Sequence, residues 1–542
     1  MELHTVLSNI FAASQISQDP ETLHEYSLAL NGSLCTPSAV VWPEKEPELI
    51  AVVEAANQHR FTIHPLAQGK NWGYGTAQGT HPQQVIVNLS RLSQVLEIND
   101  AQAYVRVQPG ITQSQLFTAL KDAKSSLQMD ITAAGLHTSL VGNILERGFG
   151  HTDYSDRFGH VQSMRVLLPT GKIITTGMGM FEHSVARHLY PYGTGPVLQG
   201  LFSQSNLGIV LEMTLALQPK PAYQATVFAL CPREGDAPEM VAAIGKLKLE
   251  GVITSGVHTV SMTRAMGEQA RQAPGAWILT TSLAGPKGVV KARYKHVKQT
   301  LKQQIPGAKI LFLDDFRWRM LCKINQYLKS PMIDSLKLVL DLKLGVPSDA
   351  AIQTLLDHPA ASSAMKTSEF PANFRWICAV SSHSRQNISE MLSICRQLFR
   401  EYGYEERYSM TNVSERAVVL IANIRFGKNE SEIEKATRFH QAIDAALLSA
   451  GFCPYRSGSG LFDTIKPFVR DENLALLATL KQSLDPNNIL SPDKYWLAHP
   501  DATKVPEAVE VAGAVVAGAV KAPETTQALA TTKALEPSSE PC

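Results

Sequence analysis

The sequence GNILERGFGHTDY, from Gly142 to Tyr154, is the most informative stretch of this 542-residue chain. A Gly-Asn step precedes a charged pair and two further glycines, which leaves backbone amides open to close approach by an anion. An earlier stretch, PLAQGKNWGYG at Pro65–Gly75, again places glycines after a strand-like run. Taken alone, each stretch is more typical of a tight turn. Together they predict one diphosphate held from both sides by backbone amides, without a metal.

The residues around these glycines predict a compact α+β unit. Strand-like runs at 38–43 and 61–65 flank a segment with apolar residues at i, i+3, i+4 and i+7, which indicates a helix. Two more strands at 85–89 and 104–107 and a helix near 113–123 complete it. Neither glycine stretch has the spacing of GxGxxG or GxxxxGK[ST], so the common dinucleotide and triphosphate sites are not supported.

Composition excludes several function classes. The formal charge is +1 with 18% charged residues and no basic stripe, so we expect no nucleic-acid partner. The N-terminus lacks the features of a secretory signal, and no stretch is long enough to span a bilayer. Cysteines without CxxC spacing predict reduced thiols in a cytoplasmic protein and no metal site. The seven are Cys35, Cys231, Cys322, Cys378, Cys395, Cys453 and Cys542.

The order of these motifs resembles the vanillyl-alcohol oxidase and 4-cresol dehydrogenase family of FAD-linked oxidoreductases, which has a PCMH-type FAD-binding domain. The resemblance spans roughly residues 35–496, and several linked motifs in the same order make it specific. Besides the two glycine stretches it rests on SAVVWP at 38–43, LPTGKIITTGMGMF at 168–181, YPYGTGPVLQGLFSQSNLGIV at 190–210, LGVPSD at 344–349 and LDPNNILSP at 484–492.

The resemblance implies an α+β fold with two large lobes. Residues 1–221 together with 452–496 are expected to form the FAD-binding domain. Residues 222–451 are expected to form a substrate or cap domain, an antiparallel sheet covered by helices, after an exit from regular structure at LQPKP. The Ala- and Pro-rich residues 497–542 are expected to be a disordered tail or, as an alternative, a short partner-binding element.

Three polar residues would carry the chemistry if the resemblance holds. In the family, a Tyr in the first glycine loop and a later Tyr-Arg pair bind the phenolate oxygen of a para-substituted phenol; Tyr74, Tyr455 and Arg456 match them. Ionising a phenol at pH 7 costs about 4 kcal/mol, which is more than one charged hydrogen bond of roughly 1.5–3 kcal/mol supplies. Two hydroxyl donors beside the guanidinium make up the difference, and hydride can then leave the benzylic carbon.

The same resemblance predicts which residues bind FAD. They lie in the two glycine stretches and in SQSNLGIV, where the adenine end is expected. The set is Gly69, Lys70, Asn71, Trp72, Gly73, Gly75, Gly142, Asn143, Arg147, Gly148, Gly208 and Ile209. Non-covalent attachment is expected, because the first loop offers no His and residues 412–430 contain neither His nor Cys. A linkage through Tyr402, Tyr404 or Tyr408 stays open.

This chain departs from the family beside the flavin. Where the family has an Asp, it reads ITAAGLHTSL at 131–140, with Ala134 or Gly135 in that place and no carboxylate in the decapeptide. His151 could replace the acid–base function, because its ordinary pKa is close to neutrality; it could equally be a hydrogen-bonded histidine at the domain interface. His137 is a weaker candidate.

Competing functions remain at this point. An FAD-linked 2-hydroxy-acid dehydrogenase could use Arg456 for a carboxylate, but the chain contains no GDGN metal motif. Tailoring of an aromatic natural product would suit the lost Asp, and a catalytically silent flavin-binding interaction protein is a third reading. The expected partners are a small aromatic substrate and either oxygen or another electron acceptor. Family members are commonly dimers or larger, so a homodimer is one expectation.

Overall fold

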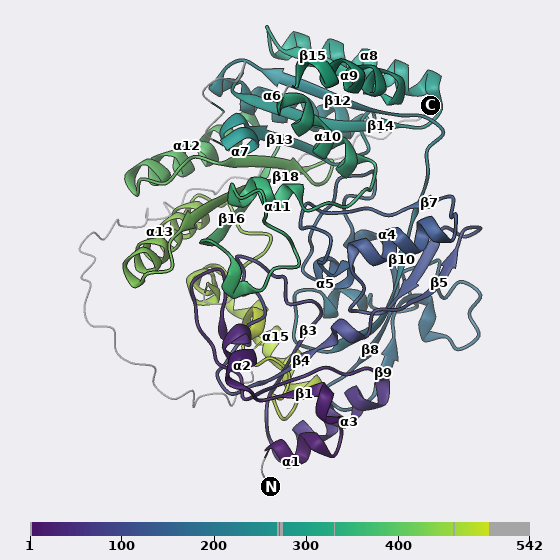
Figure 1. Ribbon diagram of the computed structural model, residues 1–542, viewed down its shortest axis with the longest axis vertical. Helices are drawn as coiled ribbons and strands as arrows, with labels where there is room; N and C mark the ends of the chain where they lie inside the picture. Colours follow the sequence, from purple (N-terminus) through teal and green to yellow (C-terminus); the bar gives the residue numbers. More distant parts are fainter. Residues whose placement is uncertain (1–2, 268–269, 271–274, 330, 459–460, 498–542) are drawn as a thin grey trace, which may run out of the picture. The chain divides into compact units, whose positions relative to one another are not determined.

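The computed structural model describes residues 3–267, 270, 275–329, 331–458 and 461–497. The chain divides into two units, residues 1–500 and 501–542. The tail predicted from residue 497 lies, apart from its first residue, outside the described residues and stays a prediction. The first unit contains a four-, a five-, a two- and a seven-stranded sheet, accompanied by helices (Figure 1).

The first sheet forms because short apolar runs are separated by an amphipathic helix. Its strands, in spatial order, are β1 (Ile16–Ser17), β2 (Ala39–Val41), β4 (Val85–Asn88) and β3 (Ile63–Leu66). β2 and β3 both run parallel to β4, and α3 (Glu46–His59) connects β2 to β3. The periodic residues Leu49, Val52, Val53 and Ala56 are the buried face of α3, as the sequence predicts.

The second sheet is antiparallel and lies next in the chain. Its order is β5 (Val95–Asn99), β6 (Tyr104–Val107), β10 (Ile209–Ala216), β8 (Val161–Leu167) and β9 (Ile173–Thr175). α4 (Gln113–Asp122) packs its apolar residues into the same core. Far later, the chain returns to the first sheet: Ile63 N donates to Ile489 O at 2.8 Å, and Ser491 N donates to Ile63 O at 2.9 Å.

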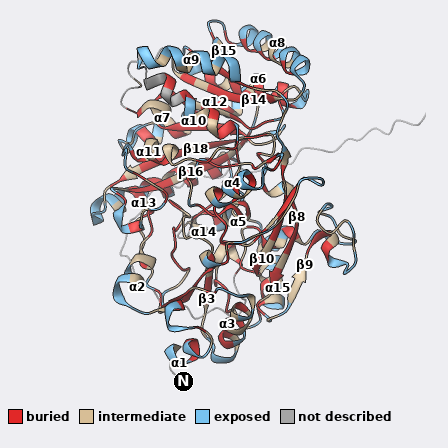
Figure 2. Cartoon of the chain, turned by 45° about the vertical axis from the view of Figure 1, so that its right-hand side comes forward, coloured by how far each residue is buried: buried red, intermediate tan, exposed pale blue. Residues whose placement is uncertain are grey.

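The cap is a seven-stranded sheet in which every neighbouring pair is antiparallel. Its order is β15 (Lys309–Asp314), β12 (Gln224–Cys231), β14 (Trp277–Ala284), β13 (Val257–Ser261), β17 (Tyr408–Asn412), β18 (Ala417–Phe426) and β16 (Asn373–Ser382). The largest core cluster packs it against α6 (Ala237–Leu249), α8 (Lys287–Gln304), α12 (Arg385–Glu401) and α13 (Glu430–Ser449). Figure 2 shows most residues of these strands as buried, except in the edge strand β15. The predicted fold class is confirmed, whereas the domain boundaries stay a prediction.

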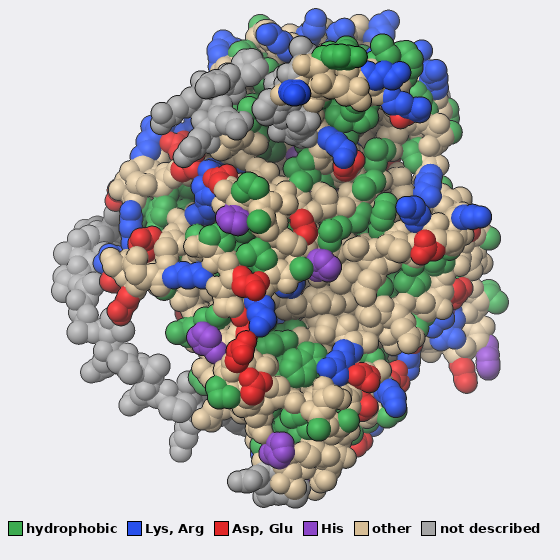
Figure 3. All heavy atoms as spheres, in the orientation of Figure 1, with side chains coloured by type: hydrophobic (Ala, Val, Ile, Leu, Met, Phe, Trp, Pro, Cys, Tyr) green, Lys and Arg blue, Asp and Glu red, His purple; other side chains and the backbone are tan. Residues whose placement is uncertain are grey.

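The remaining helices are shorter or lie at the edges of these sheets. They are α1 (Leu3–Ser8), α2 (Pro20–Ser27), α5 (Leu140–Leu145), α7 (Met262–Met266), α9 (Asp315–Leu328), α10 (Pro331–Lys343), α11 (Ala350–Leu356), α14 (Phe462–Ile465) and α15 (Asp471–Leu484). Lys and Arg side chains gather over α8 and α9 at the top of Figure 3. No helix among the described residues is both long and apolar enough to cross a membrane.

Two local features differ from the sequence prediction. The stretch beginning at Gly142 is not all loop, because residues 140–145 form α5; Ser139 caps this helix, accepting a hydrogen bond from Gly142 N at 2.9 Å. The LQPKP exit is not wholly irregular either. Its β11 (Gln218–Pro219) pairs with β7 (Leu127–Gln128), which a pattern of two prolines conceals.

A buried ion pair holds α15 to residues 485–490, where the chain returns to the first sheet. The Lys481 ammonium is 2.6 Å from Asp485 and donates to Asn206 O and Leu490 O, and neither charged side chain is exposed. Lys481→Met should lower the free energy of unfolding by roughly 3–5 kcal/mol, because it leaves a buried carboxylate without its cation. Urea unfolding followed by tryptophan fluorescence measures this. The exposed Lys466→Met is the control, and equal stability of the two variants would contradict the assignment.

Candidate active site

Both glycine stretches border one large cavity. Its volume is about 970 Å³, at the upper end of the roughly 300–1,000 Å³ of small-molecule sites. The floor comes from the loop after β3 and from α5. The segment that leaves the cap after α13 adds Tyr455 and Arg456. The roof is one face of the cap sheet, because its lining residues recur at every second position, as in Ser409 and Thr411. The cavity therefore joins segments far apart in the sequence.

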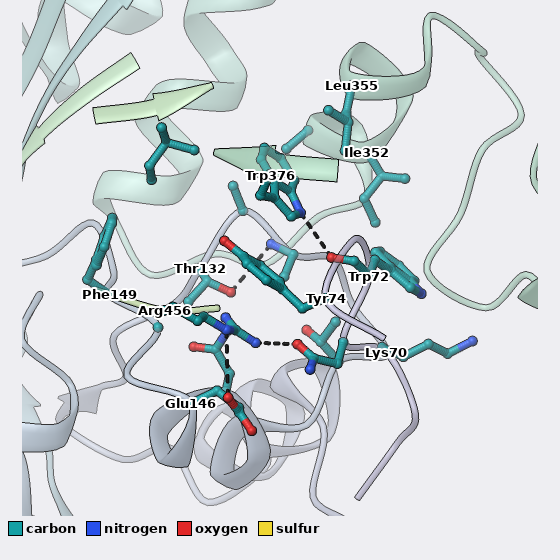
Figure 4. Close-up of a pocket in the computed structure, with 18 of the residues that line it drawn as sticks. Lys70, Trp72, Tyr74, Thr132, Glu146, Phe149, Ile352, Leu355, Trp376 and Arg456 are labelled. Carbon is teal, nitrogen blue, oxygen red and sulfur yellow. Dashed lines mark hydrogen bonds and ion pairs between the residues drawn. The ribbon is translucent and has the colours of Figure 1, made fainter. Parts of the chain in front are cut away.

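Tyr74 and Arg456 lie against each other in this cavity. The Arg456 guanidinium carbon is 4.3 Å from the centroid of the Tyr74 ring, a cation–π distance. The Tyr74 hydroxyl shares a hydrogen bond of 2.8 Å with the thiol of Cys378 on β16. Figure 4 shows the Tyr74 ring between Arg456 on one side and Trp376 on the other. The structure thus brings together two of the residues that the sequence assigns to the phenol clamp.

Glu146 balances the charge of Arg456. Its carboxylate is 3.8 Å from Arg456 Nε and 3.3 Å from Lys494 Nζ, and it accepts a hydrogen bond from the Tyr495 hydroxyl. Burial raises the pKa of Glu146, but Lys494 and Arg456 outweigh this and hold it below its usual value. Burial lowers the pKa of Arg456, but Glu146 more than compensates, so its pKa is raised. Both groups are therefore charged at neutral pH.

Tyr455 completes the predicted trio. Its ring packs against Phe149, with centroids 5.2 Å apart, and its carbonyl accepts a hydrogen bond from Gln204 at 3.1 Å. Burial raises the pKa of both Tyr455 and Tyr74, and the neighbouring Cys378 raises both further. Both phenol side chains consequently keep their protons at neutral pH and can act as hydrogen-bond donors.

His151 belongs to a second polar cluster on the cavity wall. Its ring stacks on His258 with centroids 4.0 Å apart, and Lys343 Nζ is 3.1 Å from His258 Nδ1. Burial, and then the charge of Lys343, lowers the pKa of His151 well below its usual value. Asp130 fixes the loop, because it accepts a hydrogen bond from His151 N at 3.1 Å. At neutral pH His151 is therefore uncharged, and an unprotonated ring nitrogen can accept a hydrogen bond.

Most residues predicted to bind the cofactor line the cavity. These are Gly69, Lys70, Asn71, Trp72, Gly142, Asn143, Gly148, Gly208 and Ile209. Three others do not: Gly73 faces Trp376, Gly75 lies in the same turn, and Arg147 donates to Ser203 Oγ at 3.1 Å. The Lys70 side chain points away from the cavity and donates to Met365 O at 2.8 Å, whereas Asn71 accepts from Arg456, which lines the same cavity.

The residues present fit an FAD. A Cβ on Gly208 would lie 2.5 Å from Val166 Cγ1, so only glycine allows this close packing of backbone at the cavity wall. A Cβ on Gly142 would lie 3.3 Å from Ser139 Oγ and 3.4 Å from Ala67 Cβ, so the first turn of α5 packs closely against the loop after β3. Backbone amides, small side chains and apolar walls are the donor set that a neutral cradle for a diphosphate and a flat ring requires.

Sequence reasoning missed two carboxylates that hold site residues in place. Glu146 lies inside the quoted GNILERGFG, and its only signal is a charged pair between glycines. Asp130 stands one residue before the decapeptide inspected for a carboxylate. The structure uses it to hold the His151 loop and to pair with Arg157 at 3.4 Å, and it does not line the cavity. The sequence pattern alone therefore does not reveal which acidic side chain pairs with which basic one.

Several known proteins are similar to this chain in sequence or fold. A family model described as an FAD binding domain matches residues 37–177. The chain is 28% identical to the 1'-carboxy-chondrochloren decarboxylase of Chondromyces crocatus, covering 85% of this chain and 91% of that one. It is 24% identical to the 4-cresol dehydrogenase [hydroxylating] flavoprotein subunit of Pseudomonas putida, over 84% and 87%. The 4-ethylphenol oxidase of Gulosibacter chungangensis, solved with isoeugenol, superposes with a TM-score of 0.82 at 23% identity, over 92% and 97%.

The chain contains an FAD binding domain, and its sequence and fold are similar to those of the vanillyl-alcohol oxidase and p-cresol methylhydroxylase family of FAD-linked oxidoreductases. The resemblance that the sequence motifs indicate is thereby confirmed. The FAD binding domain is shown as well, whereas the individual site residues and the mode of flavin attachment remain predictions.

The three tyrosines considered for a flavin linkage do not line the cavity. Tyr408 packs on Phe399 with centroids 5.3 Å apart, and Tyr402 and Tyr404 pack on Phe439. We therefore expect the flavin to be released by acid precipitation, with free FAD in the supernatant. A yellow pellet whose flavin fluoresces on a denaturing gel would contradict this prediction.

Lys343 predicts an unusual pH dependence of stability. Burial lowers its pKa to about 7, against roughly 10.4 in an unfolded chain. Between these values the unfolded state binds more protons, so the stability that Lys343 contributes rises with pH. The unfolding temperature of the parent minus that of Lys343→Met should therefore increase from pH 7 towards about pH 10. The exposed Lys291→Met is the control and should show no such trend. A difference in unfolding temperature for Lys343→Met that does not change with pH would contradict this prediction.

Proposed function

We propose that this FAD-linked oxidoreductase removes hydride from the benzylic carbon of a para-substituted phenol or a related aromatic substrate. The observation that carries the proposal is the contact of Arg456 with Tyr74, beside Tyr455 and in the same cavity as both glycine stretches. The structural neighbour named a 4-ethylphenol oxidase supports a phenolic substrate.

The clamp would favour the ionised phenol. Ionisation at pH 7 costs about 4 kcal/mol, and a charged hydrogen bond returns roughly 1.5–3 kcal/mol. Arg456 shares its charge with Glu146, so it needs the hydroxyls of Tyr74 and Tyr455 as further donors. Their raised pKa values keep these hydroxyls protonated and able to donate. The three groups together outweigh the cost, and the phenolate pushes electron density towards the para carbon.

FAD, when bound, supplies the acceptor for the hydride, and oxygen or another acceptor must later take up the electrons. The oxidised substrate is a quinone methide, which adds water or loses a proton. His151 is uncharged, because burial and Lys343 disfavour its cation. An unprotonated nitrogen of its ring would accept a hydrogen bond from the water and orient it for addition. In this role His151 would replace the carboxylate absent from residues 131–140.

A second candidate is oxidation coupled to loss of a carboxyl group. It is favoured by the relative named a decarboxylase, which aligns with 85% of this chain. After hydride leaves the benzylic carbon, the bond to a carboxylate on the next carbon breaks. Its electron pair forms the new double bond and restores the phenolate, and CO₂ departs. Product mass distinguishes the two candidates, because water addition raises the mass and decarboxylation lowers it.

Anaerobic bleaching of the flavin by a panel of para-alkylphenols, followed by re-oxidation in air, tests the proposed function. Arg456→Lys should slow bleaching by roughly 10–100-fold, because a Lys cannot present a planar fork to the phenolate. Tyr74→Phe removes one neutral donor and should cost roughly 2–10-fold.

The control for these variants is Arg438→Lys, which changes an exposed arginine paired with Glu434. It should bleach at the parent rate. FAD content, measured from the absorbance of each purified variant, must match the parent for the comparison to hold. Equal bleaching by Arg456→Lys and the parent with the best phenol would refute the phenolate clamp.

A further inference from the structure

Arg264 stands in the roof of the cavity. It belongs to α7, whose N-cap Ser261 ends strand β13. Its guanidinium carbon is 5.4 Å from the centroid of the Trp376 ring, and its Nη1 donates to Asn423 Oδ1 at 2.9 Å. Trp376 and Asn423 face each other in the register of β16 and β18. All three residues line the cavity.

The cationic head of Arg264 has no carboxylate partner among the described residues. The other two arginines that line the cavity have one: Arg456 has Glu146, and Arg407 has Asp357 at 2.9 Å. The guanidinium of Arg264 makes a single hydrogen bond in the described part of the chain, although it carries five N–H donors. Burial lowers its pKa to about 10, so it is still charged at neutral pH. An unpaired charge in such a place is costly unless a ligand pairs with it.

Asn423 adds an unsatisfied donor beside this charge. Its side chain is 2% exposed, and its Nδ2 has no hydrogen-bond partner among the described residues. Its Oδ1 already accepts from Arg264, so the amide nitrogen is left to donate. A buried donor without an acceptor costs roughly 1–3 kcal/mol. A guanidinium and an amide N–H at one wall form a donor set that suits the two oxygens of a carboxylate.

The roof is coupled to the phenol clamp through one strand. Trp376 Nε1 donates to Trp72 O at 2.9 Å, which ties β16 to the loop that carries Tyr74. Cys378, two residues further along β16, contacts the Tyr74 hydroxyl. In Figure 4 Trp376 and Arg456 lie on opposite sides of the Tyr74 ring. A ligand that reaches from Arg456 to the roof would therefore meet Arg264 with its other end.

We propose that Arg264 and Asn423 bind a carboxylate on the substrate, at the end away from the aromatic hydroxyl. The inference rests on the proposed function for the phenol end and narrows its substrate class to phenols whose para side chain ends in a carboxylate. It leaves open whether the carboxylate is retained or lost in the reaction.

Two matched ligands test the proposal without turnover. 4-(4-Hydroxyphenyl)-4-oxobutanoate and its methyl ester have a carbonyl at the benzylic position, so neither has a hydride to give. Calorimetry with the FAD-loaded protein at low salt measures both dissociation constants. The parent should bind the acid at least about tenfold more tightly than the ester, equivalent to roughly 1.4 kcal/mol.

Variants assign this preference to residues. Arg264→Met should reduce the ratio of the two dissociation constants to about one. Asn423→Asp should do the same, because it gives Arg264 an internal carboxylate at the place where Oδ1 already lies. Arg385→Met is the control; this exposed arginine pairs with Glu239 on the helix side of the cap and should keep the parent ratio. A ratio near one in the parent, or an unchanged ratio in Arg264→Met, would overturn the proposal.

A third ligand separates failure of this inference from failure of the proposed function. 4-Oxo-4-phenylbutanoate keeps the carboxylate and lacks the phenol hydroxyl. Binding that depends on Arg264 but is not improved by the hydroxyl would keep the carboxylate site and refute the phenol clamp. An Arg264→Met variant that loses acid and ester equally would instead assign Arg264 to the phenolate and refute the carboxylate site.

Discussion

The structure of the site depends on the pairing of Glu146 with Arg456. Glu146 follows α5, Arg456 lies in the returning chain, and Asn71 of the first glycine loop accepts from the same guanidinium. Lys494, still later in the chain, contacts the other carboxylate oxygen at 3.3 Å. One acid therefore connects four segments, and it is enclosed where charges interact strongly. Without it, the glycine stretches and the returning chain would have no common charged partner, and Arg456 would keep its charge without a countercharge.

The cap completes the site through strand register. One face of its sheet packs on helices, so alternate residues are committed to the core, and in β13, β14 and β16–β18 the residues between them face the cavity. Asn423 and Trp376 are neighbours only because β18 and β16 pair with this register. A slip by one residue would put an apolar neighbour in the place of Asn423. It would remove both the amide donor of Asn423 and the Trp376 ring on which Arg264 packs. The polar roof is therefore a consequence of how the core on the opposite face packs.

The sequence predicts local structure well where a period or a glycine requires it. The buried face of α3 follows from its apolar spacing, and the family motifs indicate the cap sheet. The sequence does not predict contacts of charged side chains with residues far away in the chain. Arg264 occurs in an ordinary SMTRAM and lies 159 positions before Asn423, so nothing nearby in the chain shows that they meet. Glu146 is visible in a quoted motif, yet its role appears only when residue 456 is placed beside it. The sequence does not predict helix α5, because Gly142 and the glycines that follow the helix are more typical of a turn.

The charges of the side chains that line the cavity favour an anionic ligand. Arg456, Lys494 and Arg264 line the cavity, and Glu146 lines it as a countercharge to the first two. Lys343 nearby has a pKa lowered to about 7 by burial, and His151 and His258 are held neutral. Adding another cation to this space is thus unfavourable, while an anion reduces the repulsion. A diphosphate, a phenolate and a carboxylate are all anions, so the same imbalance favours the cofactor and both ends of the proposed substrate.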